Sequence, residues 1–262
     1  INLDFTADVA SVNVSFEDLA DKLVTLNVSA TGRVGALVSP DVFDITFQNT
    51  TVDNVLTVTA DIDTVKGGWP WHSWLSITCD LRIDPSLNAS LDIKTNTGRI
   101  VLDTQAGVVL NSLSLETITG GIKADLVEDI VVAGDVSFKA TTGGVEFSWD
   151  NVIVENDVLV NVETTTGGVD VNVKQDERLL QNVTLTAEVT TGGIDFAIDI
   201  EGDVGAKIES STTTGGIDVD RRVGFSGTSS LLQSDNYPVS GNFNVDLETT
   251  TGGIDINAKY MP

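Results

Sequence analysis

Hydrophobic and polar residues alternate over short segments of this 262-residue chain, and a Thr-Gly-Gly turn interrupts the alternation at regular intervals. In one copy the apolar Val160 precedes the turn and Val169 and Val171 follow it, with charged or polar residues between them. Such alternation predicts half-buried strands, because neighbouring side chains on a strand point to opposite faces. The paired glycines permit the positive φ angle of a tight bend. Each turn is therefore predicted to join two β-strands.

The turn recurs along the chain and creates an internal repeat. Thr-Gly-Gly followed by Ile or Val occurs six times, with its first glycine at Gly120, Gly143, Gly167, Gly192, Gly215 and Gly252. Thr97-Gly98-Arg99 has the form of a degenerate first copy. A repeated unit of this length predicts copies stacked along an axis, each burying its apolar face against its neighbours.

The repeats predict a β-solenoid-like stack of two-strand units over residues 89–262, with parallel registry between copies. The longer last spacing indicates an insertion at residues 221–241, which is expected to map to loops on one face. A meander of antiparallel hairpins is the competing arrangement, because a Gly-Gly turn also suits a tight hairpin.

Residues 1–88 lack the repeat and are predicted to form an N-terminal β domain, antiparallel and sandwich-like, so that the whole chain is all-β. Its first strand is marked by Ile1, Leu3 and Phe5, which alternate with polar residues. Two arrangements of this strand are open. It pairs inside its own domain, or it completes a sheet in the next subunit by strand addition, which would make Ile1, Leu3 and Phe5 interface residues.

A family resemblance rests on two phrases, Glu163-Thr-Thr-Thr-Gly-Gly-Val-Asp170-Val and Glu248-Thr-Thr-Thr-Gly-Gly-Ile-Asp255-Ile. With linking segments such as Gly134-Asp135-Val136, they resemble the "putative adhesin" or toastrack-type family of repetitive secreted β proteins over about residues 90–262. The resemblance implies stacked β-repeats and a surface location more than any activity.

The composition is strongly acidic, with a formal net charge of −25 and a pI near 4.1, while a mean hydropathy of +0.12 indicates a chain that folds. Nucleic-acid binding and docking on anionic lipid are excluded as functions, because both need clustered Lys and Arg. No apolar run approaches the roughly 20 residues of a membrane span. The chain begins at Ile1 rather than Met, and we interpret it as a mature form whose signal peptide has been removed, which predicts an extracellular or cell-surface location.

One row of acids is a candidate metal site. If the copies stack in register, Asp170, Asp195, Asp218 and Asp255 line up about 4.8 Å apart. Like charges at that spacing repel by about 1 kcal/mol per pair in water. We hypothesise that a divalent cation, most plausibly Ca²⁺, bridges this row, since carboxylate oxygens suit that ion. The alternative is a solvated acidic face without bound metal.

Three further features are candidate interaction or modification sites. Trp69, Trp71 and Trp74 cluster on a predicted loop, either covering the end of the core or exposed to a glycan or neighbouring subunit. Cys79 is the only cysteine, so no internal disulfide forms; a buried free thiol is expected, with an intermolecular disulfide as the alternative. Asn-x-Ser/Thr sequons make five asparagines glycosylation candidates, namely Asn13, Asn27, Asn49, Asn88 and Asn182.

Residues for catalysis are few. His72 is the only histidine and has no matched nucleophile, and periodic acids indicate a repeated surface rather than a convergent active site. The leading hypothesis is a non-enzymatic, adhesin-like structural protein that needs no organic cofactor and self-assembles into a filament or sheath with copies of itself or other surface components. The rival hypothesis is a carbohydrate-binding or carbohydrate-cleaving β-solenoid.

Overall fold

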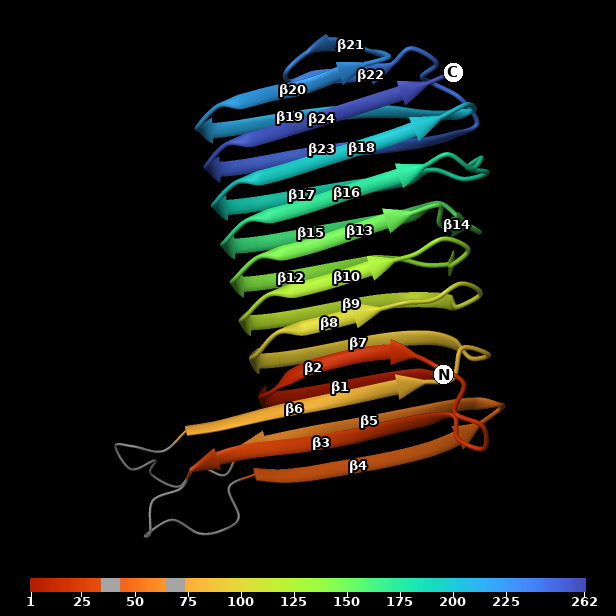
Figure 1. Cartoon of the computed structure of the whole chain (residues 1–262), viewed down its shortest axis with the longest axis vertical. Helices are drawn as coiled ribbons and strands as arrows, with labels where there is room; N and C mark the ends of the chain where they lie inside the picture. Colours follow the sequence, from red (N-terminus) through yellow and green to blue (C-terminus); the bar gives the residue numbers. More distant parts are fainter. Residues whose placement is uncertain (34–42, 65–73) are drawn as a thin grey trace.

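The computed structural model describes residues 1–33, 43–64 and 74–262, and these residues form two β-sheets that face each other along a single stack (Figure 1). The described residues contain no helix, and hence none long and apolar enough to cross a membrane. The all-β fold class is confirmed. Of the expected features, Trp69, Trp71 and His72 lie outside the described residues.

In the described residues sheet A has fourteen strands, and its path runs β21 (Phe225–Thr228), β22 (Leu231–Ser234), β19 (Val204–Thr214), β23 (Gly241–Thr251), β17 (Val183–Thr191), β15 (Val158–Thr166), β12 (Val136–Thr142), β9 (Val109–Thr119), β7 (Asn88–Thr97), β1 (Asn2–Val9), β5 (Val55–Thr64) and β4 (Phe43–Val52). Two short strands lie off this path: β11 (Val131–Val132) pairs with β9, and β14 (Ile153–Val154) pairs with β11.

Sheet B has ten strands within the same described ranges, in the order β20 (Ile217–Val223), β24 (Ile254–Met261), β18 (Ile194–Glu201), β16 (Val169–Gln175), β13 (Val145–Asp150), β10 (Ile122–Leu126), β8 (Ile100–Asp103), β2 (Ser11–Phe16), β6 (Trp74–Ile83) and β3 (Val24–Arg33).

Each repeat forms one rung, which is a strand of sheet A followed around the Gly-Gly corner by a strand of sheet B. Successive rungs pair in parallel and in register: Val160 lies between Val136 and Leu185, and Val171 lies between Phe147 and Phe196. The predicted parallel registry is therefore confirmed, and the repeats do not form the competing meander.

The core lies between the sheets, at the positions that the alternation predicted. Val160 and Val171 are fully buried, as are the aromatic side chains of Phe138, Phe147 and Trp149. Side chains at intervening positions face solvent, so Glu146 and Asp170 are exposed. Because every rung contributes the same inward positions, the apolar layer is continuous along the stack.

The corners need glycine at their first position. At Gly167 the φ angle is +148°, and a Cβ there would overlap the carbonyl oxygen of Gly143 in the preceding rung. A buried threonine three residues earlier supports the corner: Thr164 Oγ1 donates to the Gly143 carbonyl oxygen at 2.9 Å. The same bond joins Thr117 to Gly98, Thr249 to Gly192 and Thr212 to Gly252. The threonine hydroxyl thus supplies a donor to a backbone carbonyl oxygen that the tight stacking of corners would otherwise leave without one.

The spatial order of the rungs departs from the sequence order at both ends of the stack (Figure 1). The last rung in sequence, β23 and β24, lies between β17–β18 and β19–β20. The first rung, β1 and β2, lies between β5–β6 and β7–β8. Both termini are therefore built into the interior of the stack rather than left at its ends.

The structure bears on two expectations for the N-terminal segment. Both sheets run without a break across residues 88 and 89, where a domain boundary was expected, and among the described residues before 88 the antiparallel pairs are β3 with β6 and β4 with β5. The first strand pairs on both sides within its own chain, and Leu3 and Phe5 are buried in the core with Ile1 packed against it. Intramolecular pairing replaces the strand-addition arrangement, because these side chains and both strand edges are already occupied.

The insertion at residues 221–241 contributes strands as well as loops. After β20 it forms the hairpin β21–β22, and β22 pairs antiparallel with β19. Phe225 and Leu232 of this hairpin are buried. The insertion therefore covers the C-terminal end of sheet A.

Cys79 lies on the inner face of β6 and is fully buried. Burial raises the pKa of its thiol to about 12, with a further contribution from Asp80. The expected buried free thiol is confirmed, and a thiol in this position is unsuited to an intermolecular disulfide.

Candidate functional site

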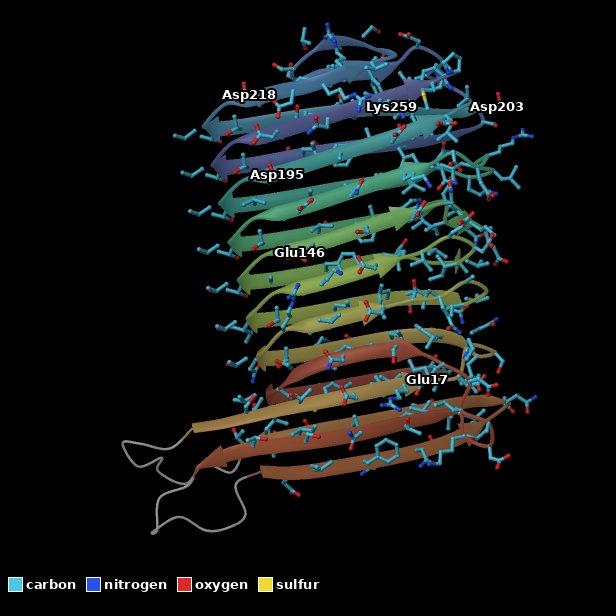
Figure 2. The ribbon with its side chains drawn as sticks, in the orientation of Figure 1. Glu17, Glu146, Asp195, Asp203, Asp218 and Lys259 are labelled. Atoms are coloured by element: carbon cyan, nitrogen blue, oxygen red, sulfur yellow. The ribbon has the colours of Figure 1, made fainter. Side chains whose placement is uncertain are left out.

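Acidic and hydroxyl side chains gather along the Thr-Gly-Gly edge of the stack and form the candidate site. On sheet B the acids lie just after the corner, and Figure 2 shows Glu146, Asp195 and Asp218 at successive levels on that side. On sheet A a second set of acids and threonines lies just before the corner. The two sets flank the same edge because each corner joins one strand of each sheet.

The aspartate row comprises Asp170, Asp195, Asp255 and Asp218, in that spatial order, and continues from Glu146. The predicted alignment is present, but Asp255 lies between Asp195 and Asp218 because the last rung is intercalated. Partial burial raises the pKa of Asp255, and the nearby charges of Asp195, Asp220 and Asp218 raise it further.

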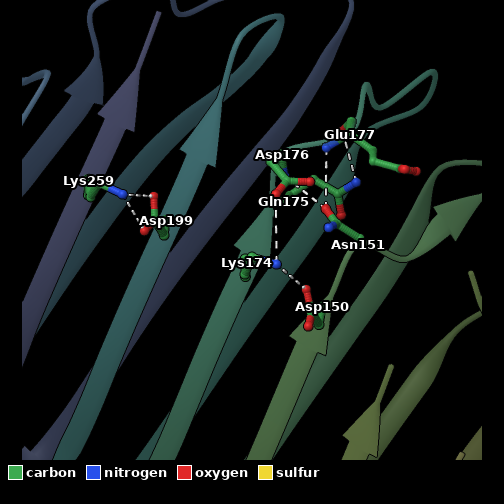
Figure 3. Close-up of polar contacts among 8 residues, drawn as sticks. All are labelled: Asp150, Asn151, Lys174, Gln175, Asp176, Glu177, Asp199 and Lys259. Carbon is green, nitrogen blue, oxygen red and sulfur yellow. Dashed lines mark hydrogen bonds and ion pairs between the residues drawn. The ribbon is translucent and has the colours of Figure 1, made fainter. Parts of the chain in front are cut away.

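Lysine and arginine side chains pair with acids that lie near the aspartate row more than with the aspartates of the row itself. Arg99, at the degenerate corner, reaches Glu146 with an Nη2 to Oε2 distance of 3.1 Å. Four residues further along the same strands, Asp150, Lys174, Asp199 and Lys259 alternate in charge across successive strands (Figure 3). Lys174 Nζ lies 3.0 Å from Asp150 Oδ1, and Lys259 Nζ lies 2.7 Å from Asp199 Oδ2. In contrast to this row of alternating charges, the aspartate row places four carboxylates on adjacent strands and forms a concentrated strip of negative charge.

The glutamate row on sheet A consists of Glu163, Glu188 and Glu248 on three adjacent strands. Lys139 Nζ lies 2.9 Å from Glu163 Oε2 at one end of this row. The pKa of Glu163 is lowered by a hydrogen bond from Asn161 and by Lys139. Glu188 and Glu248, together with Ser211, line a polar groove of about 150 Å³ that also includes Thr190, Thr213 and Thr250.

A row of exposed threonines separates the two acidic rows. The residue before each corner is threonine in seven adjacent strands, and these residues pair in register: Thr97, Thr119, Thr142, Thr166, Thr191, Thr251 and Thr214. All seven are exposed. The edge therefore presents hydroxyl groups at the strand spacing of about 4.8 Å, flanked by carboxylates. Our sequence analysis missed this row and the polar groove, although the Thr-Thr-Thr run before the glycines was a signal for both.

The aspartate row remains a candidate for calcium binding. In the part of the chain that the structure describes, no group of three or more His, Cys, Asp or Glu side chains is arranged to hold a metal ion. Any bridging would therefore use pairs of carboxylates on adjacent strands, such as Asp195 and Asp255.

Calcium bridging predicts a specific effect on stability. Millimolar CaCl₂ should raise the melting temperature more than NaCl at the same ionic strength, because a bridging cation adds to the screening of the row. In the double variant D195N/D255N, CaCl₂ should raise the melting temperature no more than NaCl does. Equal effects of the two salts on the native protein would contradict direct bridging.

A second prediction concerns the pH dependence of Asp255. Because the folded-state pKa of this carboxyl is raised, its charge destabilises the fold above that pKa, and this penalty disappears as the pH falls below the unfolded value. D255N should therefore raise the melting temperature at neutral pH and reduce the stability gained by mild acidification. D203N is the matched control, since Asp203 is exposed on the opposite edge (Figure 2). A D255N variant that melts below the native protein at neutral pH would contradict this account.

The other candidate residues are dispersed. Trp74 begins β6 opposite Arg33, at the N-terminal end of the stack. The sequon asparagines Asn13, Asn27, Asn49 and Asn88 are exposed. Asn182 is half-buried, and its Oδ1 accepts from the backbone nitrogen of Asn242 at 3.2 Å. Trp69 and Trp71, the other members of the predicted tryptophan cluster, lie outside the residues that the structure describes.

Comparison with protein-family models and with curated proteins gives no match. Two solved structures align over nearly the whole chain. A "putative cell adhesion protein" from Clostridium sporogenes is 15% identical, with a TM-score of 0.43, and the alignment covers 100% of this chain and 92% of that one. A "putative adhesin" from Bacteroides fragilis is 14% identical, with a TM-score of 0.39 and coverages of 97% and 91%. At this level of similarity, functional inference rests on the residues of the present chain.

Proposed function

We propose that this chain is a non-enzymatic, adhesin-like protein of the cell surface, in which a stiff two-sheet stack holds an acidic, hydroxyl-rich edge toward its partner. Contact would be multivalent: each rung offers the same threonine and carboxylate groups, so many weak contacts add along the edge. Partners that suit this chemistry are surfaces bearing basic groups or bound cations, and hydroxyl-rich glycans.

The observation that carries the proposal is the in-register repetition of Thr166, Thr191 and Thr251 between the glutamate and aspartate rows. A catalytic site gathers unlike groups at one place, whereas this edge repeats like groups over many rungs. Parallel strand ladders on both sides make the edge rigid, so its groups need little ordering on binding.

An extracellular location and self-association are parts of the same proposal. Exposed sequon asparagines and a strongly acidic surface suit a glycosylated, exported protein that stays soluble through self-repulsion. Self-association would place several acidic edges side by side and increase their combined affinity.

Binding of protein-coated beads to cells, and to basic and glycan-coated surfaces, tests the proposal. The variant E163Q/E188Q/E248Q should bind clearly less than the native protein. The control E128Q/E155Q/E177Q removes the same charge from exposed loop positions away from the corner, and it should bind like the native protein. Equal binding of all three proteins, or a catalytic turnover of glycans, would overturn the proposal.

The rival hypothesis is a glycan-binding or glycan-cleaving solenoid that uses Trp69, Trp71 and Trp74. Two of these tryptophans lie outside the described residues, and the third begins β6 at the N-terminal end of the stack. The same bead assay on glycan-coated surfaces, repeated with W69A/W71A, separates binding through the tryptophans from binding through the acidic edge.

A further inference from the structure

The two ends of the stack differ in how their terminal strands are protected. At the C-terminal end, β21 is only four residues long, and β20 carries Asp218, Asp220, Arg221 and Arg222 with a register shift between Val219 and Arg221. Short strands, charges and bulges are features that discourage pairing with another chain.

The N-terminal end has neither a short terminal strand nor a bulge, and its terminal strands carry few charges. Its terminal strands β4 and β3 are ten residues long, contain no proline and pair regularly with β5 and β6. Only Asp44 and Arg33 are charged among their residues. In the described ranges no strand pairs with the outer edge of either one. Two long, nearly neutral edges are thus available for strand addition.

The apolar core is also uncovered at this end by the residues that the structure describes. Ile45 and Phe47 of β4 lie opposite the buried Ile62 and Ala60, so they are on the core side of the sheet, yet they are 40% and 46% exposed. With Val24, Leu26 and Val28 of β3 they line a groove of about 540 Å³. Within the described part of the chain, this groove is the last layer of the core and is open along the axis of the stack.

We propose that a second copy of this chain docks on the N-terminal end, with β4 against β4 and β3 against β3. A twofold axis normal to the sheets pairs both edges antiparallel at once and closes the two apolar grooves on each other. A second copy is favoured because each edge can pair with its own copy across the twofold axis. The two edge strands also carry only Asp44 and Arg33, so their pairing brings few charges of a chain of charge −25 into contact. The product is a closed pair rather than a filament, since the protected C-terminal ends point outward.

This inference rests on the self-association in the proposed function, and sedimentation of the free protein tests it separately from adhesion. The native chain should show a concentration-dependent dimer that strengthens with salt, because screening reduces repulsion between acidic subunits. F47D should weaken the dimer about tenfold or more, as expected for loss of a central aromatic contact. V223D is the matched control, because Val223 is 43% exposed on the terminal strand β20 and should leave the dimer unchanged.

Cysteine substitution gives a second measurement that does not alter the groove. Thr46, Gln48 and Thr50 are exposed on the outer face of β4, and the native Cys79 is buried. In T46C, Q48C and T50C, mild oxidation should cross-link two copies most readily at the position nearest the twofold axis, whereas T228C on β21 should not cross-link. A native chain that stays monomeric at all concentrations, or a dimer that cross-links at T228C and not through β4, would overturn the inference. Adhesion by such monomers would leave the proposed adhesive function intact.

Discussion

Replacing Gly167 with alanine should destabilise the fold by about 3 kcal/mol or more. The φ angle of +148° at Gly167 is one that side-chain-bearing residues rarely adopt, and the added Cβ would overlap the Gly143 carbonyl oxygen. Relief would require the Gly143 and Gly167 rungs to separate, which breaks the corner hydrogen bond from Gly143 N to Thr166 O as well. Urea unfolding followed by circular dichroism measures the loss.

The second glycine of the same corner provides the control. At Gly168 an added Cβ would lie 3.7 Å from the nearest atom, the Gly193 carbonyl oxygen, which is an ordinary contact distance. G168A should therefore change the free energy of unfolding by about 1 kcal/mol or less. Similar losses in G167A and G168A would show that the corners do not stack as described.

Truncating Trp149 should cost about 4 kcal/mol, as is typical for the loss of a large buried aromatic residue. Trp149 on β13 is fully buried, and its ring lies edge-on to Phe243 on β23 in the opposite sheet at a centroid distance of 5.9 Å. Its Nε1 donates to Gln175 Oε1 at 3.0 Å. W149A would leave a cavity between the sheets and a buried carbonyl oxygen without its donor.

A smaller substitution separates the loss of apolar packing from the loss of the hydrogen bond to Gln175. W149F keeps most of the apolar volume but removes the donor to Gln175, so its loss should be about 2 kcal/mol and smaller than that of W149A. Thermal and urea unfolding of both variants, monitored by circular dichroism, provide the comparison. A loss below about 1 kcal/mol in W149A would contradict close packing between the sheets at this level.

The alternation around each Thr-Gly-Gly turn predicted the strands and the parallel rungs correctly, because inward residues such as Val160 and Val171 repeat at fixed places relative to the corner. It also placed the four aspartates in one row. The order of rungs could not be predicted, since the inward Val219 of one copy and Ile256 of another offer nearly the same surface to a neighbouring rung. Which of several similar rungs becomes the neighbour of a given rung depends on the length of the segments that connect the rungs and on what covers the ends of the stack.

The strand partners of the N-terminal segment were harder to predict for a related reason. The first strand was recognised, but Leu3 and Phe5 give no indication of which partner they join, so pairing within the chain and between chains looked alike. At the candidate site, the role of Thr164 was hidden because it lies in the Thr-Thr-Thr run before the glycines, which reads as part of the turn. Only the stacked corners show that its hydroxyl bonds the Gly143 carbonyl oxygen.

The intercalated rungs restrict the order in which this protein can be completed during synthesis. A ribosome releases β19 and β20 before β23 and β24 exist, yet these later strands must lie between β17–β18 and β19–β20. The earlier strands therefore cannot settle in their final place until β23 and β24 have emerged, and until then the edges of β17 and β18 remain open. The nascent chain therefore passes through a stage in which an unpaired rung is exposed to chaperones or to neighbouring copies, and the rung of β23 and β24 is inserted after the rungs on both of its sides have been made.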